Sequence, residues 1–269
     1  MSLGIVIKSP EGLVLAAESR ITLGVKKKSA TGTDTSNCYF DHATKLISFA
    51  QPNEYIGVVT YGQAVIGQSE QRTAASFLPE FESTLPSNRL SVEDFAKRVS
   101  QFYLDQWKRS MPPIEKSVNI PDMTFVVAGF DENDIYGKVF VIDIPRRPVP
   151  QERSAGTQFG ITYGGQIEYI HRLSQGFDFR LPQTLTNELQ LNKQQQQKLN
   201  STLGKYASIV PYNILALQDC IDLAKFYINT TIEAQRLSVG TRGVGGEIDI
   251  AFIRRGQKIN FVNRKMEHF

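Results

Sequence analysis

The chain has 269 residues, of which 41% are hydrophobic and 21% charged, a composition typical of a soluble globular protein. Its formal net charge of +3 is too small to indicate a nucleic-acid or membrane-surface partner, and no apolar run approaches the roughly 20 residues that cross a bilayer. The two cysteines, Cys38 and Cys220, have no CxxC or metal-ligand spacing, and the N-terminus lacks a secretory pattern. We therefore expect a cytoplasmic protein with free thiols, no metal and no other cofactor, forming a single domain over residues 1–269.

The first quarter of the sequence predicts two hairpins separated by a polar segment. Residues 4–20, GIVIKSPEGLVLAAESR, predict two strands because the turn sequence SPEG separates two apolar runs. Residues 24–41 are rich in Lys, Ser, Thr and Gly and predict an exposed loop. Residues 45–62, KLISFAQPNEYIGVVTYG, predict a second hairpin that turns at QPN.

Helical periodicity follows. Residues 64–81 predict a helix, and a second helix is predicted from a capping-box-like Ser91-x-x-Asp94 to about Lys108, where Met-Pro-Pro ends it.

Strands and helices then alternate to the end of the sequence. Strands are predicted at residues 123–130, 138–144 and 158–165. The Gln-rich residues 192–200 are interpreted as a solvated helix face or a linker, and Tyr212 to Arg236 as a long amphipathic helix. Residues 247–262 predict a closing hairpin. This order indicates an α+β fold in which two antiparallel sheets are sandwiched between two helix layers.

A nucleophilic hydroxyl needs a base, and histidine is not a favoured candidate here. The three histidines, His42, His171 and His268, lie in no hydrolase signature, so a Ser-His-Asp triad is not favoured. An α-amino group, with a pKa of about 7.7–8.0, is the other solution. Ser2 would carry both base and nucleophile once Met1 is removed. Taken alone, the N-terminus favours the simpler interpretation, that Ser2 is the common small residue that follows an initiator methionine.

An ordered set of motifs extends this idea over nearly the whole chain. These motifs are GLVLAAESR (residues 12–20), ATKLIS around Lys45, TYGQAVIGQ (60–68), TFVVAGFDEN, GKVFVIDI, ITYGGQIEY and VGGEIDIAFI. In this order they resemble the β-type subunits of the proteasome and their bacterial relatives. The interval from Ser2 to Glu18 is similar to that between the family's nucleophile and its acid.

The resemblance implies a four-layer αββα N-terminal-nucleophile (Ntn) hydrolase fold and a role for each matching residue. Ser2 would attack the scissile carbonyl, and its own amine would move the proton through a water molecule. Lys45 would favour the alkoxide, Glu18 would hold Lys45 charged and oriented, and the Gly62 amide would face the oxyanion.

Four further residues would bind substrate. Thr22 would pair its backbone with an extended peptide. Thr60 and Ala64, beside Ile21, would line a pocket for an uncharged side chain. The resemblance also implies a peptide or unfolded-protein substrate and a homo-oligomer, a ring or stacked assembly, without identifying any unfoldase partner.

The sequence departs from the family pattern around the amine. The acid is Glu18 rather than Asp, and the nucleophile is Ser2 rather than Thr. Thr241, Val244 and Tyr163 occupy accessory positions where the family often has residues that contact the amine. Two other readings therefore stay open: a non-catalytic assembly subunit, and an amidase or transpeptidase on the same scaffold.

Overall fold

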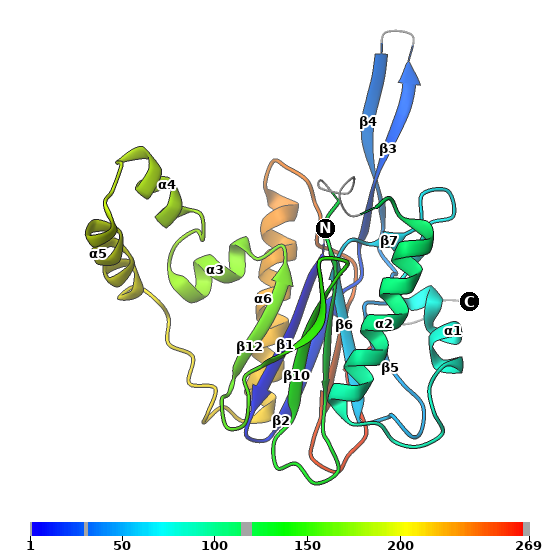
Figure 1. Ribbon diagram of the computed structural model, residues 1–269. Coiled ribbons are helices and arrows are strands. Elements are labelled where there is room, and N and C mark those ends of the chain that lie inside the picture. Colours follow the sequence, from blue (N-terminus) through cyan, green and yellow to red (C-terminus); the bar gives the residue numbers. More distant parts are fainter. Residues whose placement is uncertain (1, 30–31, 114–119, 266–269) are drawn as a thin grey trace.

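The computed structural model describes residues 2–29, 32–113 and 120–265. Two five-stranded antiparallel sheets pack face to face, and helices cover the outer face of each (Figure 1). The predicted fold class, an α+β sandwich with layers in the order αββα, is confirmed.

The first sheet is built around the N-terminal hairpin. Its order is β12-β1-β2-β13-β14. The strands are β12 (Gly160–Gly165), β1 (Leu3–Ser9), β2 (Gly12–Glu18), β13 (Ile248–Ile253) and β14 (Asn260–Asn263). The hairpins predicted at residues 4–20 and 247–262 are both present, and they join through pairing of β2 with β13.

The second sheet has the order β11-β10-β9-β6-β5. The strands are β11 (Arg147–Arg153), β10 (Lys138–Ile144), β9 (Met123–Gly129), β6 (Ile56–Gly62) and β5 (Leu46–Ser48). All but β11 were predicted from the sequence. The strand β11, RPVPQER, lies at the sheet edge and is mostly exposed, so its two prolines are tolerated and it shows no apolar alternation.

Successive side chains of the central strands point alternately into two apolar layers, one under the helices and one between the sheets. In β1, Leu3, Ile5 and Ile7 face the helix layer, whereas Val6 lies between the two sheets. All residues of β1 and β2 are buried, because each sheet is covered on both faces. This explains why the strands appear in the sequence as nearly continuous apolar runs.

Two long helices cover the sandwich. The helix α2 (Val92–Ser110) packs with α1 (Leu78–Ser83) on the second sheet, and α6 (Leu217–Leu237) packs on the first. Both long helices were predicted. The Oγ of Ser91 caps α2 by accepting the Asp94 N–H at 3.0 Å, whereas α6 begins at Leu217 rather than at Tyr212.

The prediction of a loop at residues 24–41 is wrong. The chain forms a hairpin there, β3 (Ile21–Ser29) and β4 (Gly32–Phe40), in antiparallel register from Ile21 opposite Phe40. Figure 1 shows the hairpin projecting away from the sandwich. Residues 24–41 are polar and show no apolar alternation, which is why the sequence did not predict these strands.

The helix predicted at residues 64–81 is also wrong for most of its length. The segment forms β7 (Val65–Ile66), β8 (Arg72–Thr73), a short 3₁₀ turn at Ala75–Phe77 and then α1. Gly67 has a φ of +114°, and a Cβ there would lie 2.0 Å from the Glu70 carbonyl oxygen. This left-handed turn is incompatible with a helix. Helical structure begins only at the 3₁₀ turn and continues into α1, which has a proline in its first turn.

Three short helices connect β12 to α6. They are α3 (Glu168–Gln175), α4 (Leu181–Glu188) and α5 (Lys193–Gly204). The Gln-rich segment is thus helical, beginning with a capping box between Asn192 and Gln195. The helices α3 and α4 were not predicted. No residue of α4 or α5 is buried, so neither has the apolar stripe that predicts a helix.

No helix within the described ranges has the length and apolar character needed to cross a membrane.

Candidate active site

Ser2 lies immediately before β1 and is only 3% exposed. Its carbonyl oxygen accepts the Gln166 N–H at 2.8 Å, just beyond β12. Gly165 approaches so closely that a Cβ there would lie 1.8 Å from the Ser2 carbonyl oxygen. The neighbouring strands therefore fix the backbone of Ser2 on entry to the sheet. Met1 lies outside the described residues.

Glu18 is the last residue of β2, and the β1–β2 register brings it beside Leu3. Its carboxylate is buried and accepts backbone N–H groups from Leu3 (3.1 Å), Arg20 (2.8 Å) and Gly245 (3.1 Å). A buried carboxylate is costly unless it is paired and hydrogen-bonded, and Glu18 meets both conditions.

Lys45 supplies the counter-charge. Its Nζ donates to Oε1 of Glu18 and to the carbonyl oxygen of Arg20. Burial lowers the pKa of Lys45, and the Glu18 carboxylate acts in the opposite direction. The Lys45 carbonyl oxygen also accepts the Thr60 N–H at 2.9 Å, so β6 holds the lysine backbone in place.

The structure brings most of the predicted site residues around one small cavity of about 20 Å³. Ser2, Lys45, Ile21, Thr60 and Ala64 all line it. Glu18 stands behind Lys45 and joins the site through the ion pair. The volume is about that needed for one water molecule. Ser2 and Lys45 thus line the same small space.

Gly62 and Thr22 do not line this cavity. Gly62 ends β6 with a φ of +88°, and a Cβ there would lie 2.2 Å from the Asp122 carbonyl oxygen, so the turn requires glycine. Thr22 lies on β3, which pairs with β4 alone in its two-stranded sheet. The Thr22 Oγ1 is buried without a hydrogen-bond partner among the described residues.

The accessory positions differ in their surroundings. Thr241 is exposed, whereas Val244 is buried in the apolar layer under α6, with its N–H donating to Gln235 Oε1 at 3.0 Å. Tyr163 packs against the same apolar layer. None of the three lines the small cavity.

Sequence reasoning missed Gly245 as a contact of the acid. Gly245 lies in the segment GVGG (residues 243–246) just before β13, and its N–H donates to Glu18 Oε2 at 3.1 Å. A Cβ at Gly245 would lie 2.4 Å from the Arg20 guanidinium carbon. A sequence signal for this contact is the pair of glycines, Gly245 and Gly246, just before β13, because β13 pairs with β2 and β2 ends at Glu18.

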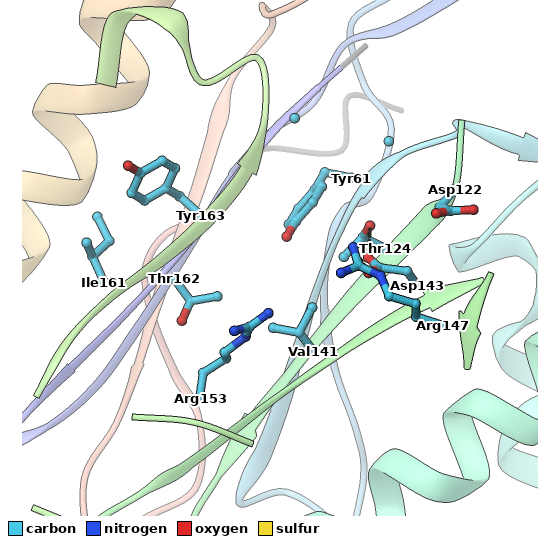
Figure 2. Close-up of a pocket in the computed structure, with 12 residues that line it drawn as sticks. Tyr61, Asp122, Thr124, Val141, Asp143, Arg147, Arg153, Ile161, Thr162 and Tyr163 are labelled. Atoms are coloured by element: carbon cyan, nitrogen blue, oxygen red, sulfur yellow. Dashed lines mark hydrogen bonds and ion pairs between the residues drawn. The ribbon is translucent and has the colours of Figure 1, made fainter. Parts of the chain in front are cut away.

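A second, larger cavity of about 520 Å³ adjoins the site (Figure 2). Tyr61 lines both cavities, and Gly62 and Gly165 line the larger one. Among the residues that the structure describes, no three His, Cys, Asp or Glu side chains gather as metal ligands.

No protein-family model matches the chain, and no curated protein matches its sequence. Solved structures do match its fold. One is a Gly-1 mutant of Anbu from Hyphomicrobium sp. strain MC1, with a TM-score of 0.55 and 12% identity, covering 98% of this chain and 86% of that one. Another is Anbu from the same strain, with a TM-score of 0.47 and 13% identity, covering 97% and 87%. The first of these matches shows that the chain shares its overall fold with Anbu.

Proposed function

We propose that the chain is a proteasome-like peptidase that hydrolyses amide bonds with Ser2 as an N-terminal nucleophile, after removal of Met1. The observation that carries the proposal is the buried Glu18–Lys45 ion pair behind a cavity that Ser2 also lines. A buried ion pair adds little stability over apolar residues of similar volume, and buried charges with perturbed pKa values cluster at functional sites.

The chemistry would proceed in two steps. The Ser2 Oγ attacks the carbonyl carbon and its proton passes, through a water, to the free α-amine of the same residue. The proton then moves to the leaving nitrogen as the C–N bond breaks, which leaves an ester on Ser2. A water attacks that ester, gives its proton back to Ser2 and releases the acid. Lys45 stabilises the alkoxide, and the Gly62 N–H stabilises the oxyanion.

Substrate would enter as an extended peptide. The strand β3 pairs with β4 on one edge only, which leaves an edge for strand addition at Thr22. The small cavity, with Ile21, Thr60 and Ala64 on its walls, is about the size of one water molecule and suits an uncharged side chain no larger than a methyl group before the cleaved bond. Peptides or unfolded chains fit this entry, and we expect the protein to act as a homo-oligomer.

The test begins with the intact mass of the purified protein, which should lack Met1. An electrophile that traps N-terminal nucleophiles should then add once to the wild type. Ser2→Ala should gain no adduct, whereas Ser2→Thr, which keeps hydroxyl and amine, should still be labelled. A chain that lacks Met1 but gains no adduct on Ser2 would rule the proposal out.

The alternatives make different predictions in the same assay. The buried Val244, an apolar side chain at one of the accessory positions, favours the non-catalytic assembly subunit. That protein would assemble, by light scattering after gel filtration, without labelling at Ser2. A transpeptidase would label at Ser2 but transfer the acyl group to an added amine faster than to water.

A further inference from the structure

The larger cavity lies between the two sheets at the edge formed by β12 and β11. The strand β12 forms one wall, with Thr162 turned toward the cavity and Ile161 and Tyr163 turned toward α6, and residues of β6, β9, β10 and β11 form the other wall (Figure 2). Its volume of about 520 Å³ is within the range of small-ligand sites. The proposed active site uses only the rim of this cavity, at Gly62 and Gly165.

The acidic groups of the cavity already have partners. Asp143 is buried; its Oδ1 accepts from the Thr124 hydroxyl at 2.7 Å, and its Oδ2 pairs with Arg147 at 2.6 Å. Asp122 pairs with Arg146 at 2.6 Å. Two carboxylates are thus neutralised by two guanidinium groups.

Arg153 is the charged residue of the cavity lining that these ion pairs do not include. Its side chain makes no hydrogen bond or ion pair with any residue that the structure describes, and its guanidinium points into the cavity between Thr162 and Val141 (Figure 2). The Tyr61 hydroxyl points into the same space. Burial raises the pKa of Tyr61, with Asp143 acting in the same direction, so this hydroxyl stays protonated and can donate. One positive charge and two hydroxyls, of Tyr61 and Thr162, therefore face the cavity.

We infer that this cavity binds a carboxylate on the leaving-group side of a peptide, and that the enzyme removes short fragments from the carboxyl end of its substrates. This inference rests on the proposed function. The small cavity with Ile21, Thr60 and Ala64 takes the side chain before the bond, so the space beyond Gly62 remains for the leaving group. A single uncommitted guanidinium near two carboxylates suits a monoanion better than a phosphate dianion.

Matched peptides test the inference. Acetylated peptides extend one, two or three residues beyond the cleaved bond. Each peptide is made in two forms, one with a free C-terminal carboxylate and one with a C-terminal carboxamide, and the two forms are compared. The wild type should cleave the carboxylate form with a kcat/KM about tenfold higher, the scale of one charge-assisted hydrogen bond. Arg153→Gln and Tyr61→Phe should each lower that ratio, the first toward one. The control Arg98→Gln, on the exposed face of α2, should keep the wild-type ratio.

Binding separates this inference from the proposed chemistry. The Ser2→Ala variant is titrated calorimetrically with acetyl-Ala-Ala and with its carboxamide, with and without Arg153→Gln. Tighter binding of the carboxylate that is lost in Arg153→Gln supports the cavity assignment even if Ser2 is never labelled. If Ser2 is labelled but the carboxylate and carboxamide peptides are bound and cleaved equally well, the proposed enzyme activity stands and the carboxylate site is ruled out.

Discussion

The ammonium of Lys45 and the N–H of Leu3 bind the same oxygen, Oε1, of Glu18. This oxygen is fully buried, and the lysine side chain is only 7% exposed. One carboxylate therefore fixes both the charge of the proposed site and the residue next to Ser2. The position of the nucleophile and the position of the cation are coupled through Glu18.

Loss of that carboxylate should destabilise the whole sandwich. In Glu18→Gln, Lys45 stays buried without its counter-charge, and breaking a buried pair costs about 3–5 kcal/mol. We expect a loss of this size in the free energy of unfolding, measured by denaturant titration, together with loss of Ser2 labelling. The double variant Glu18→Gln/Lys45→Met should recover part of the stability because no charge is left unpaired. A double variant as unstable as the sum of the two single variants would contradict the pairing argument.

The pH dependence of stability should report the lowered pKa of Lys45. Burial is the main cause of the lowering, from the ordinary value of 10.5. Between the folded-state pKa and 10.5, the unfolded chain binds a proton that the folded chain does not. The free energy of unfolding should therefore rise with pH in this window, relative to Glu18→Gln/Lys45→Met, which lacks both groups. Denaturant titrations from pH 7 to pH 10 measure this difference. A difference that falls with pH would mean that Glu18 raises the lysine pKa instead.

Gly165 should be necessary for the position of Ser2. Its φ is +95°, and an added Cβ would meet the Ser2 carbonyl oxygen. In Gly165→Ala we expect the Ser2 segment to shift and labelling of Ser2 to fall at least tenfold, because misplacing a reacting group by about 1 Å costs on the order of 10²-fold. Gly256→Ala is the matched control, since Gly256 has a φ of +70° but open space around it. It should lose only about 1–2 kcal/mol of stability. Equal labelling in both variants would contradict this role.

The base of the projecting hairpin should depend on one ion pair. Arg20 binds Asp41 through two hydrogen bonds, at 2.6 and 2.7 Å, and also donates to the Arg242 carbonyl oxygen at 3.2 Å. We expect Arg20→Gln and Asp41→Asn to speed amide hydrogen exchange in β3 and β4 while leaving α2 unchanged. A double-mutant cycle should give a coupling of about 1 kcal/mol, since the pair is partly exposed. Unchanged exchange in β3 would show that β3–β4 pairing alone holds the hairpin.

The sequence alone determined the strands that pack on both sides and the two long helices. The strands within residues 4–20 and 123–144 are apolar because each is buried on both faces, and α2 and α6 carry an apolar stripe because each packs on a sheet. Ser2, Glu18 and Lys45 were predicted from the resemblance of the ordered motifs to proteasome β-type subunits. The signals for the strands and helices are local, since burial of a strand or a helix face leaves a periodic pattern in the residues themselves.

Tertiary structure decided what had no such pattern. The hairpin β3–β4 and the helices α4 and α5 pack little surface on the core, so their residues carry no periodicity. The contact of Gly245 with Glu18 joins residues that are far apart in the sequence. The cavity around Arg153 exists only because β11 and β12, from different sheets, face each other. A site made by two sheets depends on how they stack, and no segment of the sequence encodes that alone.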